Sequence, residues 1–287
     1  MREDDRILCL DLGGTKLRAA IISGGEIKEK KVFSTCISRG LEGIKETLLL
    51  GLSAYEGVFR GVAVSSAGNI DPESGNVIYA TDNLPGYTGF PLGRFLQEKS
   101  GMPCACINDG CAAALGEYYL SGQEGEVMLF LTLGTGVGGA YVKDGKILFG
   151  TDGMLGHKTL FADGLKCNCG RSGCVEKYAS GSAFRSLLKT ADVKYDTPDA
   201  IWSAFARGES SVCSCVESWA DNVKAALKMY YEFLPFSRVV LGGGMSDSGK
   251  YWLDLVREEN FSVDLARGGD DAGLIGAYVH FKKKFQS

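Results

Sequence analysis

The chain has 287 residues, of which 45% are hydrophobic and 23% are charged, a composition typical of a globular protein with two ordinary domains or one large one. Its formal net charge of −4 provides no broad basic surface, which argues against nucleic acid and anionic membranes as partners and favours small molecules. The first six residues are too charged for a signal peptide, and no apolar run approaches the ~20 residues that span a bilayer, so we expect a cytoplasmic protein.

The first predicted elements form a β-hairpin with a glycine turn. Strands at residues 6–10 and 17–22 flank the segment Asp11-Leu12-Gly13-Gly14-Thr15-Lys16. The two glycines allow backbone N–H groups to approach an anion closely, and Thr15 and Lys16 add a hydroxyl group and a positive charge. The segment is not a Walker loop, because no helix follows it. It therefore predicts a phosphate-binding hairpin, with an ordinary turn as the alternative.

A polar pair follows at the end of a later strand. Before it, the pattern predicts a strand at 27–32, a helix at 41–54, a buried strand at 61–65, a functional loop region at 65–91 with a short strand at 77–79, and a helix at 91–100. A strand at 103–107 then ends in Asn108 and Asp109, and an alanine-rich helix covers 110–119. Open α/β sheets place ligands at such junctions, so Asp109 is a candidate general base and Asn108 a candidate partner of a substrate hydroxyl. The alternative is that Asp109 only caps the helix.

A second glycine hairpin lies in the middle of the chain. A strand at 127–133 leads into Gly134-Thr135-Gly136-Val137-Gly138-Gly139. This segment fits the dinucleotide fingerprint Gly-x-Gly-x-x-Gly, but that fingerprint requires a helix directly afterwards. Here a strand, an Asp-Gly turn at 144–145 and another strand follow instead. The pattern therefore predicts a second phosphate-binding hairpin and not a Rossmann site.

A cluster of potential metal ligands follows this hairpin. His157, Cys167, Cys169 and Cys174 form a Cys₃His set, which suits tetrahedral zinc with no open coordination position. The ten cysteines of a chain of this size indicate metal ligands or free thiols more than disulfides, and free cysteines remain the alternative reading of this cluster. We expect a structural zinc ion here.

The last third of the chain contains mostly helices. The spacing of apolar residues predicts helices at 177–189, 198–206 and 216–234, and the last of these has an apolar face typical of a core or dimer contact. An apolar strand at 238–241 runs into Gly242-Gly243-Gly244. These elements alone indicate no chemistry.

Taken in order, these motifs resemble those of the ROK sugar kinases, the group of bacterial-type glucokinases and N-acetylmannosamine kinases. The motifs that carry the resemblance are Asp11 to Lys16, Asn108 to Glu117, Leu133 to Ala140, and the set His157, Cys167, Cys169, Cys174 and Glu176. The glycine run 242–244 resembles the family's adenosine-side loop, and residues 272–277 resemble its closing helix.

The resemblance implies an α/β fold with two lobes, of the actin and hexokinase-like (ribonuclease H-like) type, with a structural zinc element. A small lobe would comprise residues 1–117 and 271–287, and a large lobe 118–270 with the zinc element at 157–176. It also implies a homodimer.

The resemblance further implies an ATP-dependent kinase that phosphorylates a hexose or hexose derivative at its 6-hydroxyl, with ATP and Mg²⁺ held between the lobes. Asp109 would be the general base, and the sugar would contact Asn108, His157 and Glu176, with weaker candidates at Gly68, Asn69 and Thr81. The residues implied for the nucleotide are Asp11, Gly13, Gly14, Thr15, Lys16, Gly134, Thr135, Gly136, Gly138, Gly243 and Gly244.

One residue departs from the family pattern. Family members usually carry Glu-x-Gly-His, whereas this chain has Met154 at the position of the glutamate. A methionine accepts hydrogen bonds poorly, so it would face an N-acetyl methyl group or an aglycone more readily than sugar hydroxyls. N-acetylated amino sugars of the N-acetylmannosamine type therefore gain weight over glucose, with β-glucosides also open. The alternative function is a sugar-binding regulatory protein with weak or no kinase activity.

Overall fold

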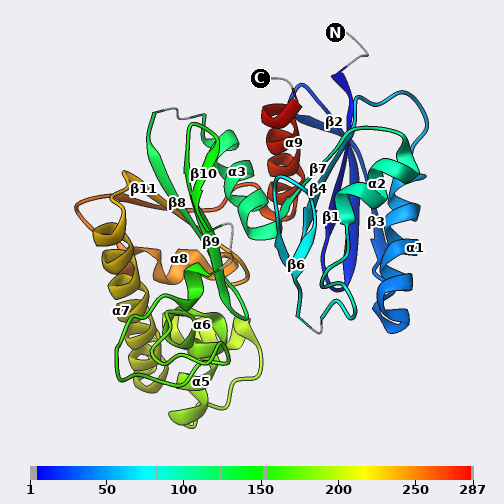
Figure 1. Cartoon of the computed structure of the whole chain (residues 1–287). Coiled ribbons are helices and arrows are strands. Elements are labelled where there is room, and N and C mark those ends of the chain that lie inside the picture. The colour runs from blue at the N-terminus through cyan, green and yellow to red at the C-terminus, as the bar shows by residue number, and fades with distance from the viewer. Residues whose placement is uncertain (1–4, 82, 123–124, 151–153, 286–287) are drawn as a thin grey trace. The chain divides into compact units, whose positions relative to one another are not determined.

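The computed structural model of the chain describes residues 5–81, 83–122, 125–150 and 154–285. Residues 1–4 lie outside the described residues. They belong to the charged segment on which the expectation about a signal peptide rests. Contacts divide the chain into two compact units, residues 1–123, 145–153 and 270–287 in the first and residues 124–144 and 154–269 in the second (Figure 1). Residues 118–123, 145–153 and 270 thus belong to the first unit, whereas the resemblance implies the large lobe for them.

The first unit is built on a five-stranded sheet in the order β3-β2-β1-β4-β7. Its strands are β1 (Ile7–Leu12), β2 (Lys16–Ser23), β3 (Glu26–Ser34), β4 (Val62–Ser66) and β7 (Cys104–Asn108). β1 is antiparallel to β2 and parallel to β4, and β4 is parallel to β7. The carboxyl ends of β1, β4 and β7 therefore lie at one edge of the sheet, which is where Asp11 and the pair 108–109 occur.

Helices cover both faces of this sheet. They are α1 (Gly40–Leu52), α2 (Leu92–Ser100), α3 (Asp109–Ser121) and α9 (Ala272–Phe285). Helices α1 and α2 lie on one face of the sheet and α9 on the other (Figure 1). Side chains alternate along β1, so Leu8 and Leu10 pack in one core with α1 and α2, whereas Ile7 and Cys9 pack with α9. The remaining elements of the unit are η2 (Ile37–Arg39), β5 (Asn69–Ile70), β6 (Val77–Tyr79) and β10 (Lys146–Phe149).

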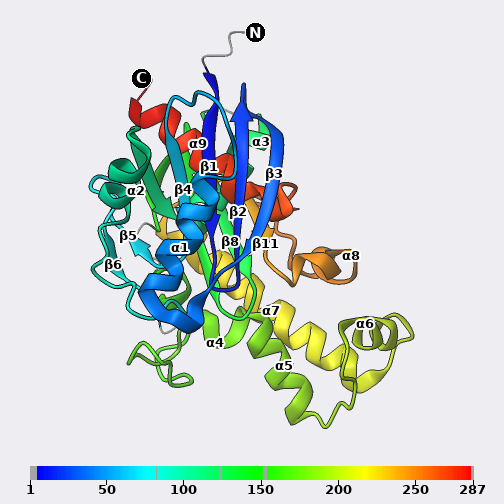
Figure 2. The ribbon, with the colours of Figure 1, turned by 90° about the vertical axis from the view of Figure 1, so that its right-hand side faces the viewer.

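The second unit contains four strands in the order β9-β8-β11-β12. They are β8 (Val127–Leu133), β9 (Val137–Lys143), β11 (Arg238–Gly242) and β12 (Ser262–Leu265). The helices are α4 (Glu176–Ala179), α5 (Gly181–Thr190), α6 (Pro198–Ala206), α7 (Ser210–Phe233) and α8 (Gly249–Trp252), with short 3₁₀ turns η3 (Leu155–His157), η4 (Ser246–Ser248) and η5 (Leu253–Val256). One continuous core joins the strands to α7, which runs alongside α5 and α6 (Figure 2).

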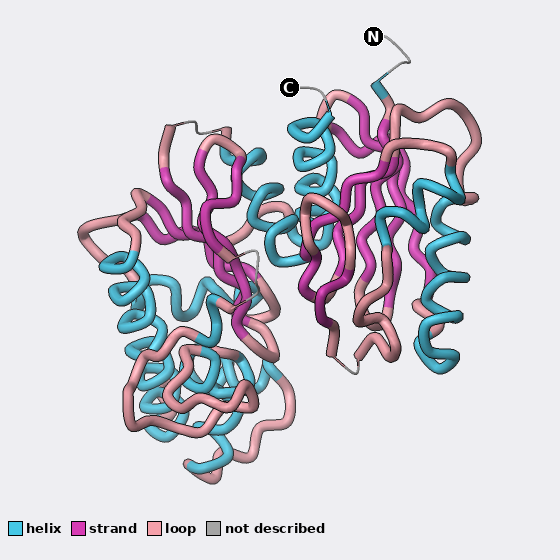
Figure 3. The backbone as a smooth tube through the Cα atoms, viewed as in Figure 1, coloured by secondary structure: helices cyan, strands magenta, loops and turns pink. Residues whose placement is uncertain are grey.

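The α/β class is confirmed, and both units contain strands and helices (Figure 3). The single helix expected at 177–189 is wrong: the chain breaks at Ser180, whose φ of −73° and ψ of 162° are extended and whose side chain accepts from the N–H of Ala183 to cap α5. Buried Trp219 stabilises this break, because its indole N–H lies 3.0 Å from the carbonyl of Ala179. The sequence analysis also missed β5 and β12. None of the described helices has the length and apolarity needed to cross a membrane.

Candidate functional site

The first glycine hairpin is the turn between β1 and β2. The N–H of Gly13 donates to the carbonyl of Lys16 at 2.9 Å, which closes the turn. Gly14 does not have a positive φ, and a Cβ added there would meet its nearest atom, the carbonyl oxygen of Asn83, at an ordinary 3.5 Å. Neither backbone conformation nor packing within the protein therefore requires glycine at this position. Close approach of a ligand to the backbone is the remaining physical reason.

Asp11, at the end of β1, is held by two side chains that the sequence analysis did not single out. Ser65 Oγ donates to Oδ1 at 2.6 Å, and Arg18 Nη1 lies 3.2 Å from Oδ2. Arg18 lies directly opposite Asp11 in the β1–β2 register, so the hairpin pattern itself contained this signal. Burial raises the pKa of Asp11, and the bonds from Ser65 and Arg18 oppose that shift. A carboxylate cannot attract phosphate directly, so this group suits a cation that accompanies phosphates.

Asn108 and Asp109 lie where β7 passes into α3. Asn108 is the N-cap: its Oδ1 accepts from the N–H of Cys111 at 3.1 Å, while its Nδ2 donates to the carbonyl of Gly68 at 2.8 Å and to Asp109 Oδ1 at 2.9 Å. The capping role considered for Asp109 is thus taken by its neighbour. The N–H of Gly110 also donates to Asp109 Oδ1, at 2.8 Å. Both bonds orient the carboxyl through one oxygen and leave Oδ2 to other partners.

The pKa of Asp109 is shifted toward neutral pH. Removal from bulk water, and next the negative charge of Asp11, raise the pKa of Asp109 to about 6, against the opposing bond from Gly110. The Asp109 side chain is exposed, so water and a substrate can reach the carboxyl. A carboxylate with a raised pKa at an accessible position is suited to accept a proton near neutral pH.

A pocket of about 430 Å³ opens in the first unit beside these residues. We call it the first-unit pocket; the described residues that line it are Gly14, Thr15, Ile37, Ala67, Gly68, Tyr79, Ala80, Thr81, Asn83 and Leu84. All of them are uncharged, and the hydroxyl and amide groups among them can bind a neutral polar ligand. Four of these residues, Gly14, Thr15, Gly68 and Thr81, were predicted from the sequence, whereas Tyr79, which is 60% exposed, was not.

The second glycine hairpin, between β8 and β9, is braced from within its own unit. The N–H of Gly134 donates to the carbonyl of Gly136 at 3.0 Å, and Glu176 Oε2 accepts from the N–H of Val137 at 3.1 Å. A Cβ added at Gly136 would lie only 2.2 Å from Glu176 Oε2, so a side chain there would displace this carboxylate and break its bond with the N–H of Val137. A Cβ at Gly134 would meet nothing within 4 Å.

A larger pocket, of about 780 Å³, adjoins this hairpin and is called here the second-unit pocket. Gly134, Thr135 and Gly244 line one part of it, and a Cβ at Gly244 would also meet nothing within 4 Å. Its apolar wall includes Phe184 and Trp202, whose rings stack at 5.4 Å with an interplanar angle of 16°. The charged residues that line it are Arg185, Lys189, Asp192 and Asp196. A flat apolar group joined to an anionic chain fits such a surface.

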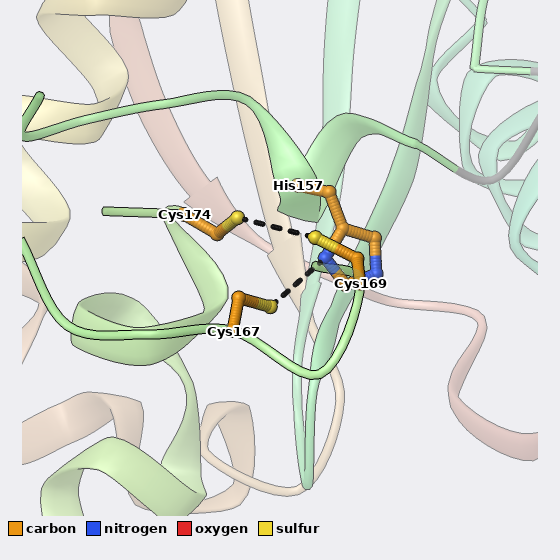
Figure 4. A group of neighbouring side chains, drawn as sticks. All are labelled: His157, Cys167, Cys169 and Cys174. Carbon is orange, nitrogen blue, oxygen red and sulfur yellow. Dashed lines mark hydrogen bonds between the residues drawn. The ribbon is translucent and has the colours of Figure 1, made fainter. Parts of the chain in front are cut away.

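The four predicted metal ligands come together in the second unit (Figure 4). Their ligand atoms all lie within 4.8 Å of one another; Cys167 Sγ is 3.4 Å from His157 Nδ1, and Cys169 Sγ is 3.6 Å from Cys174 Sγ. Bond lengths of ~2.0–2.3 Å around a tetrahedral zinc place neighbouring ligands at about these separations. The donor set and its geometry therefore fit zinc. Because Nδ1 faces the thiols, His157 keeps Nε2 for another partner.

The residues predicted to contact the nucleotide or the sugar are divided between the two units. The first unit contains Asp11, Gly13, Gly14, Thr15, Lys16, Gly68, Asn69, Thr81, Asn108 and Asp109. The second contains Gly134, Thr135, Gly136, Gly138, Met154, His157, Glu176, Gly243 and Gly244. Met154 directly precedes η3, and its carbonyl accepts from the N–H of His157 at 3.0 Å, so its place is tied to a metal ligand.

Comparisons with known proteins agree on one family. The model of the ROK family matches residues 7–284. An N-acetylmannosamine kinase of Haemophilus influenzae is 32% identical over 286 residues, which cover 95% of this chain and 94% of that protein. The solved ROK hexokinase from Thermus thermophilus is 31% identical with a TM-score of 0.84, covering 98% of this chain and 100% of that one. A ROK family glucokinase from Streptomyces griseus, solved with glucose and AMPPNP, is 28% identical with a TM-score of 0.75, covering 95% and 98%.

Proposed function

This chain belongs to the ROK family, and from that premise we propose that it is an ATP-dependent sugar kinase that phosphorylates a hexose or hexose derivative at its 6-hydroxyl. The observation that carries the proposal is the oriented, accessible carboxyl of Asp109, whose pKa is raised to about 6. Relatives named as kinases of sugars support it, because they match almost the whole chain.

The phosphoryl donor is assigned to the second-unit pocket. The stacked Phe184 and Trp202 would form the wall beside the adenine, while Gly134, Thr135 and Gly244 would let phosphates approach the backbone. The first hairpin, Gly13 to Lys16, would contribute further N–H groups and a positive charge, and Asp11 would hold Mg²⁺. When bound, Mg²⁺ neutralises charge on the phosphate oxygens.

The acceptor chemistry is assigned to the first unit. Asp109 would take the proton of the sugar hydroxyl as the hydroxyl oxygen forms a bond to the γ-phosphorus and the bond to the ADP oxygen breaks. Asn108 fixes Asp109 Oδ1 and can bind a second hydroxyl. Gly68, Asn69 and Thr81 would hold other parts of the sugar, with the uncharged lining of the first-unit pocket suited to a neutral ring.

A structural zinc ion is proposed for the Cys₃His cluster. Cys167, Cys169 and Cys174 would bind it as thiolates, with Nδ1 of His157 as the fourth ligand. This would fix the imidazole so that Nε2 can bind a sugar hydroxyl, and it would fix Glu176 two residues beyond the last ligand. Zinc would take no part in bond making.

The substrate class is proposed from Met154. Its thioether favours an N-acetyl methyl group over hydroxyls, so we assign an N-acetylated amino sugar of the N-acetylmannosamine type, with glucose and β-glucosides as competitors. The N-acetylmannosamine kinase of H. influenzae, which matches 95% of the chain, supports this order. A homodimer is proposed on the resemblance alone, and its mass in solution tests it.

A second candidate function also rests on Met154. A protein that lacks the usual glutamate could bind a sugar without phosphorylating it efficiently, which would make it a sugar-responsive regulatory protein. One experiment distinguishes the kinase from the regulatory protein. The purified protein is incubated with ATP, Mg²⁺ and one sugar at a time: N-acetylmannosamine, N-acetylglucosamine, glucose or a β-glucoside. The products are identified by ³¹P NMR. A sugar 6-phosphate is expected, with most from N-acetylmannosamine. Sugar binding by calorimetry without any sugar phosphate would favour the regulatory protein.

A further inference from the structure

Two adjacent acidic residues precede α9, and each forms an ion pair with a different strand of the first sheet. The 3₁₀ turn η6 (Gly269–Asp271) carries both of them. Asp270 Oδ1 lies 2.8 Å from Arg18 Nη2 on β2, and Asp271 pairs with Lys30 on β3. The two pairs are alike in sequence position and in charge, so they form a natural comparison.

The two cations differ in what else they contact. Arg18 also binds Asp11 through Nη1, at 3.2 Å, so that Asp270, Arg18 and Asp11 form a continuous ionic chain. We call it the 270–18–11 chain. The guanidinium group of Arg18 is forked, and this allows Arg18 to hold one carboxylate with each terminal nitrogen. Lys30 has no such second branch, and its ion pair with Asp271 does not involve Asp11.

The start of α9 also packs closely against Asp11. A Cβ added at Gly273 would lie 3.0 Å from Asp11 Oδ1 and 3.2 Å from Ser65 Oγ, so the first turn of α9 leaves no spare room beside this carboxylate. Ser65 Oγ fixes the same oxygen at 2.6 Å. One side of the carboxylate is therefore fixed by Ser65 and the packing of α9, and the other side depends on the position of Arg18.

We infer that Asp270 is a positioning residue for the phosphoryl donor, because it holds Arg18 against Asp11 and thereby orients the carboxylate at the first hairpin. This inference rests on the proposed function, in which Asp11 holds the cation of the nucleotide. Asp270 itself touches neither donor nor acceptor. Its side chain is 78% exposed, so its loss weakens an ion pair without leaving a buried charge. Exposed ion pairs of this kind change an affinity by about two- to fivefold.

The test compares Asp270→Asn with Asp271→Asn in the full-length protein. Asp270→Asn is expected to raise the KM for MgATP, and the Mg²⁺ concentration for half-maximal rate, by about two- to fivefold, with kcat and the sugar KM unchanged. Asp271→Asn should leave all four constants at the wild-type values, and Asp270→Glu should restore the donor KM. The difference should also shrink in ~1 M salt, because salt screens exposed charges.

Equal effects of the two asparagine variants, or a fall in kcat alone, would show a structural role and overturn the inference, as would unchanged constants for Asp270→Asn. Failure of the proposed function has a different signature, since the wild type would then show no turnover dependent on sugar. In that event calorimetric binding of Mg-AMPPNP to the same variants still decides the question. Weaker binding by Asp270→Asn alone supports the inference, and equal binding by both variants contradicts it.

Discussion

The two glycine hairpins look alike in sequence but differ in what surrounds them. The first, between β1 and β2, lies beside the charged residues Asp11 and Arg18, and a Cβ added at Gly14 would make only ordinary van der Waals contacts. The second, between β8 and β9, is braced by Glu176, which makes Gly136 necessary for packing. Packing within the protein therefore does not explain the glycine at position 14, whereas in the second hairpin it explains Gly136 and not Gly134. In the proposed function, the first hairpin handles the charge of the phosphates and their cation, and the second hairpin binds the nucleotide.

The two pockets differ in the same way. The described residues that line the first-unit pocket are uncharged, which suits the proposed sugar ring, whereas the second-unit pocket combines stacked aromatic rings with four charged side chains, which suits the proposed nucleotide. Variants that damage one ligand's binding and spare the other's can test this division.

The largest effect is expected from Asp109→Asn. Removal of a general base costs ~10²- to 10⁴-fold in kcat. Asparagine keeps the shape of the side chain, so the Kd values for ATP and sugar should stay close to wild type. Stopped-flow or coupled kinetics gives kcat, and calorimetry gives the two Kd values. Asp71→Asn, in an exposed turn of the same unit, is the matched control.

The pH dependence of kcat/KM in the wild type tests the same assignment of Asp109 as the general base. The raised pKa favours the neutral carboxyl, so the basic form is lost as the pH falls through about 6. Below that pH, kcat/KM should fall by about tenfold per unit. Asp109→Asn should lack this acidic limb; a variant that retained it would show that another group is titrating.

The next largest effect is expected from loss of the proposed zinc ion, whose four candidate ligands all lie in the second unit. Chelation, or Cys174→Ser, should lower the Tm by ~10 °C or more and abolish activity, because closed zinc sites contribute directly to folding. Cys213→Ser, at a half-buried cysteine outside the cluster, should change neither. Metal analysis of the purified protein accompanies the melting curves. A protein without bound zinc and with an unchanged Tm would contradict the zinc assignment.

A pair of variants in the second hairpin tests the two kinds of glycine. Gly134→Ala adds a methyl group where the protein has open space, so the Tm should not change while the KM for ATP rises by ~5-fold or more. Gly136→Ala places its methyl group against Glu176 Oε2, so it should destabilise the protein by ~1–3 kcal/mol. Denaturant unfolding and steady-state kinetics separate the effects. If Gly134→Ala bound ATP like the wild type, the second-unit pocket would not be the donor site.

At Met154 the expected effect is a change in sugar preference and not a loss of activity. Met154→Glu should favour glucose over N-acetylmannosamine, by about 5- to 100-fold in the ratio of kcat/KM, because each buried hydroxyl that gains a partner contributes ~1–3 kcal/mol. Met154→Leu keeps the position apolar and should preserve the wild-type preference. Competition between the two sugars in one reaction measures the ratio directly. An unchanged ratio in Met154→Glu would show that this residue does not select the sugar.

Local patterns predicted the features that lie close together in the chain. Both hairpins, the junction at Asn108 and Asp109, and the gathering of His157 with the three cysteines were visible because each occupies less than 20 residues. The presence of zinc and the role of Asp109 stay predictions. The family was also recognisable, because its motifs occur in order.

Features that depend on distant partners could not be predicted in this way. Asp270 reaches Arg18 across about 250 residues of chain, and nothing in either local sequence indicates the pair. Phe184 and Trp202 line a pocket only because α5 and α6 pack together. The break at Ser180 likewise depends on the indole of Trp219, which binds the backbone there and outweighs the helical pattern of 177–189.

The central claim is that this protein transfers phosphate from ATP to a sugar. The most direct measurement is ADP release by the purified wild type at pH 7.5 with saturating MgATP, with and without N-acetylmannosamine, N-acetylglucosamine, glucose or a β-glucoside. At least one of these sugars should raise the rate by 100-fold or more over the rate without sugar, as expected when a positioned base assists the transfer, by ~10²- to 10⁴-fold. A rate that none of these sugars raises would contradict the account.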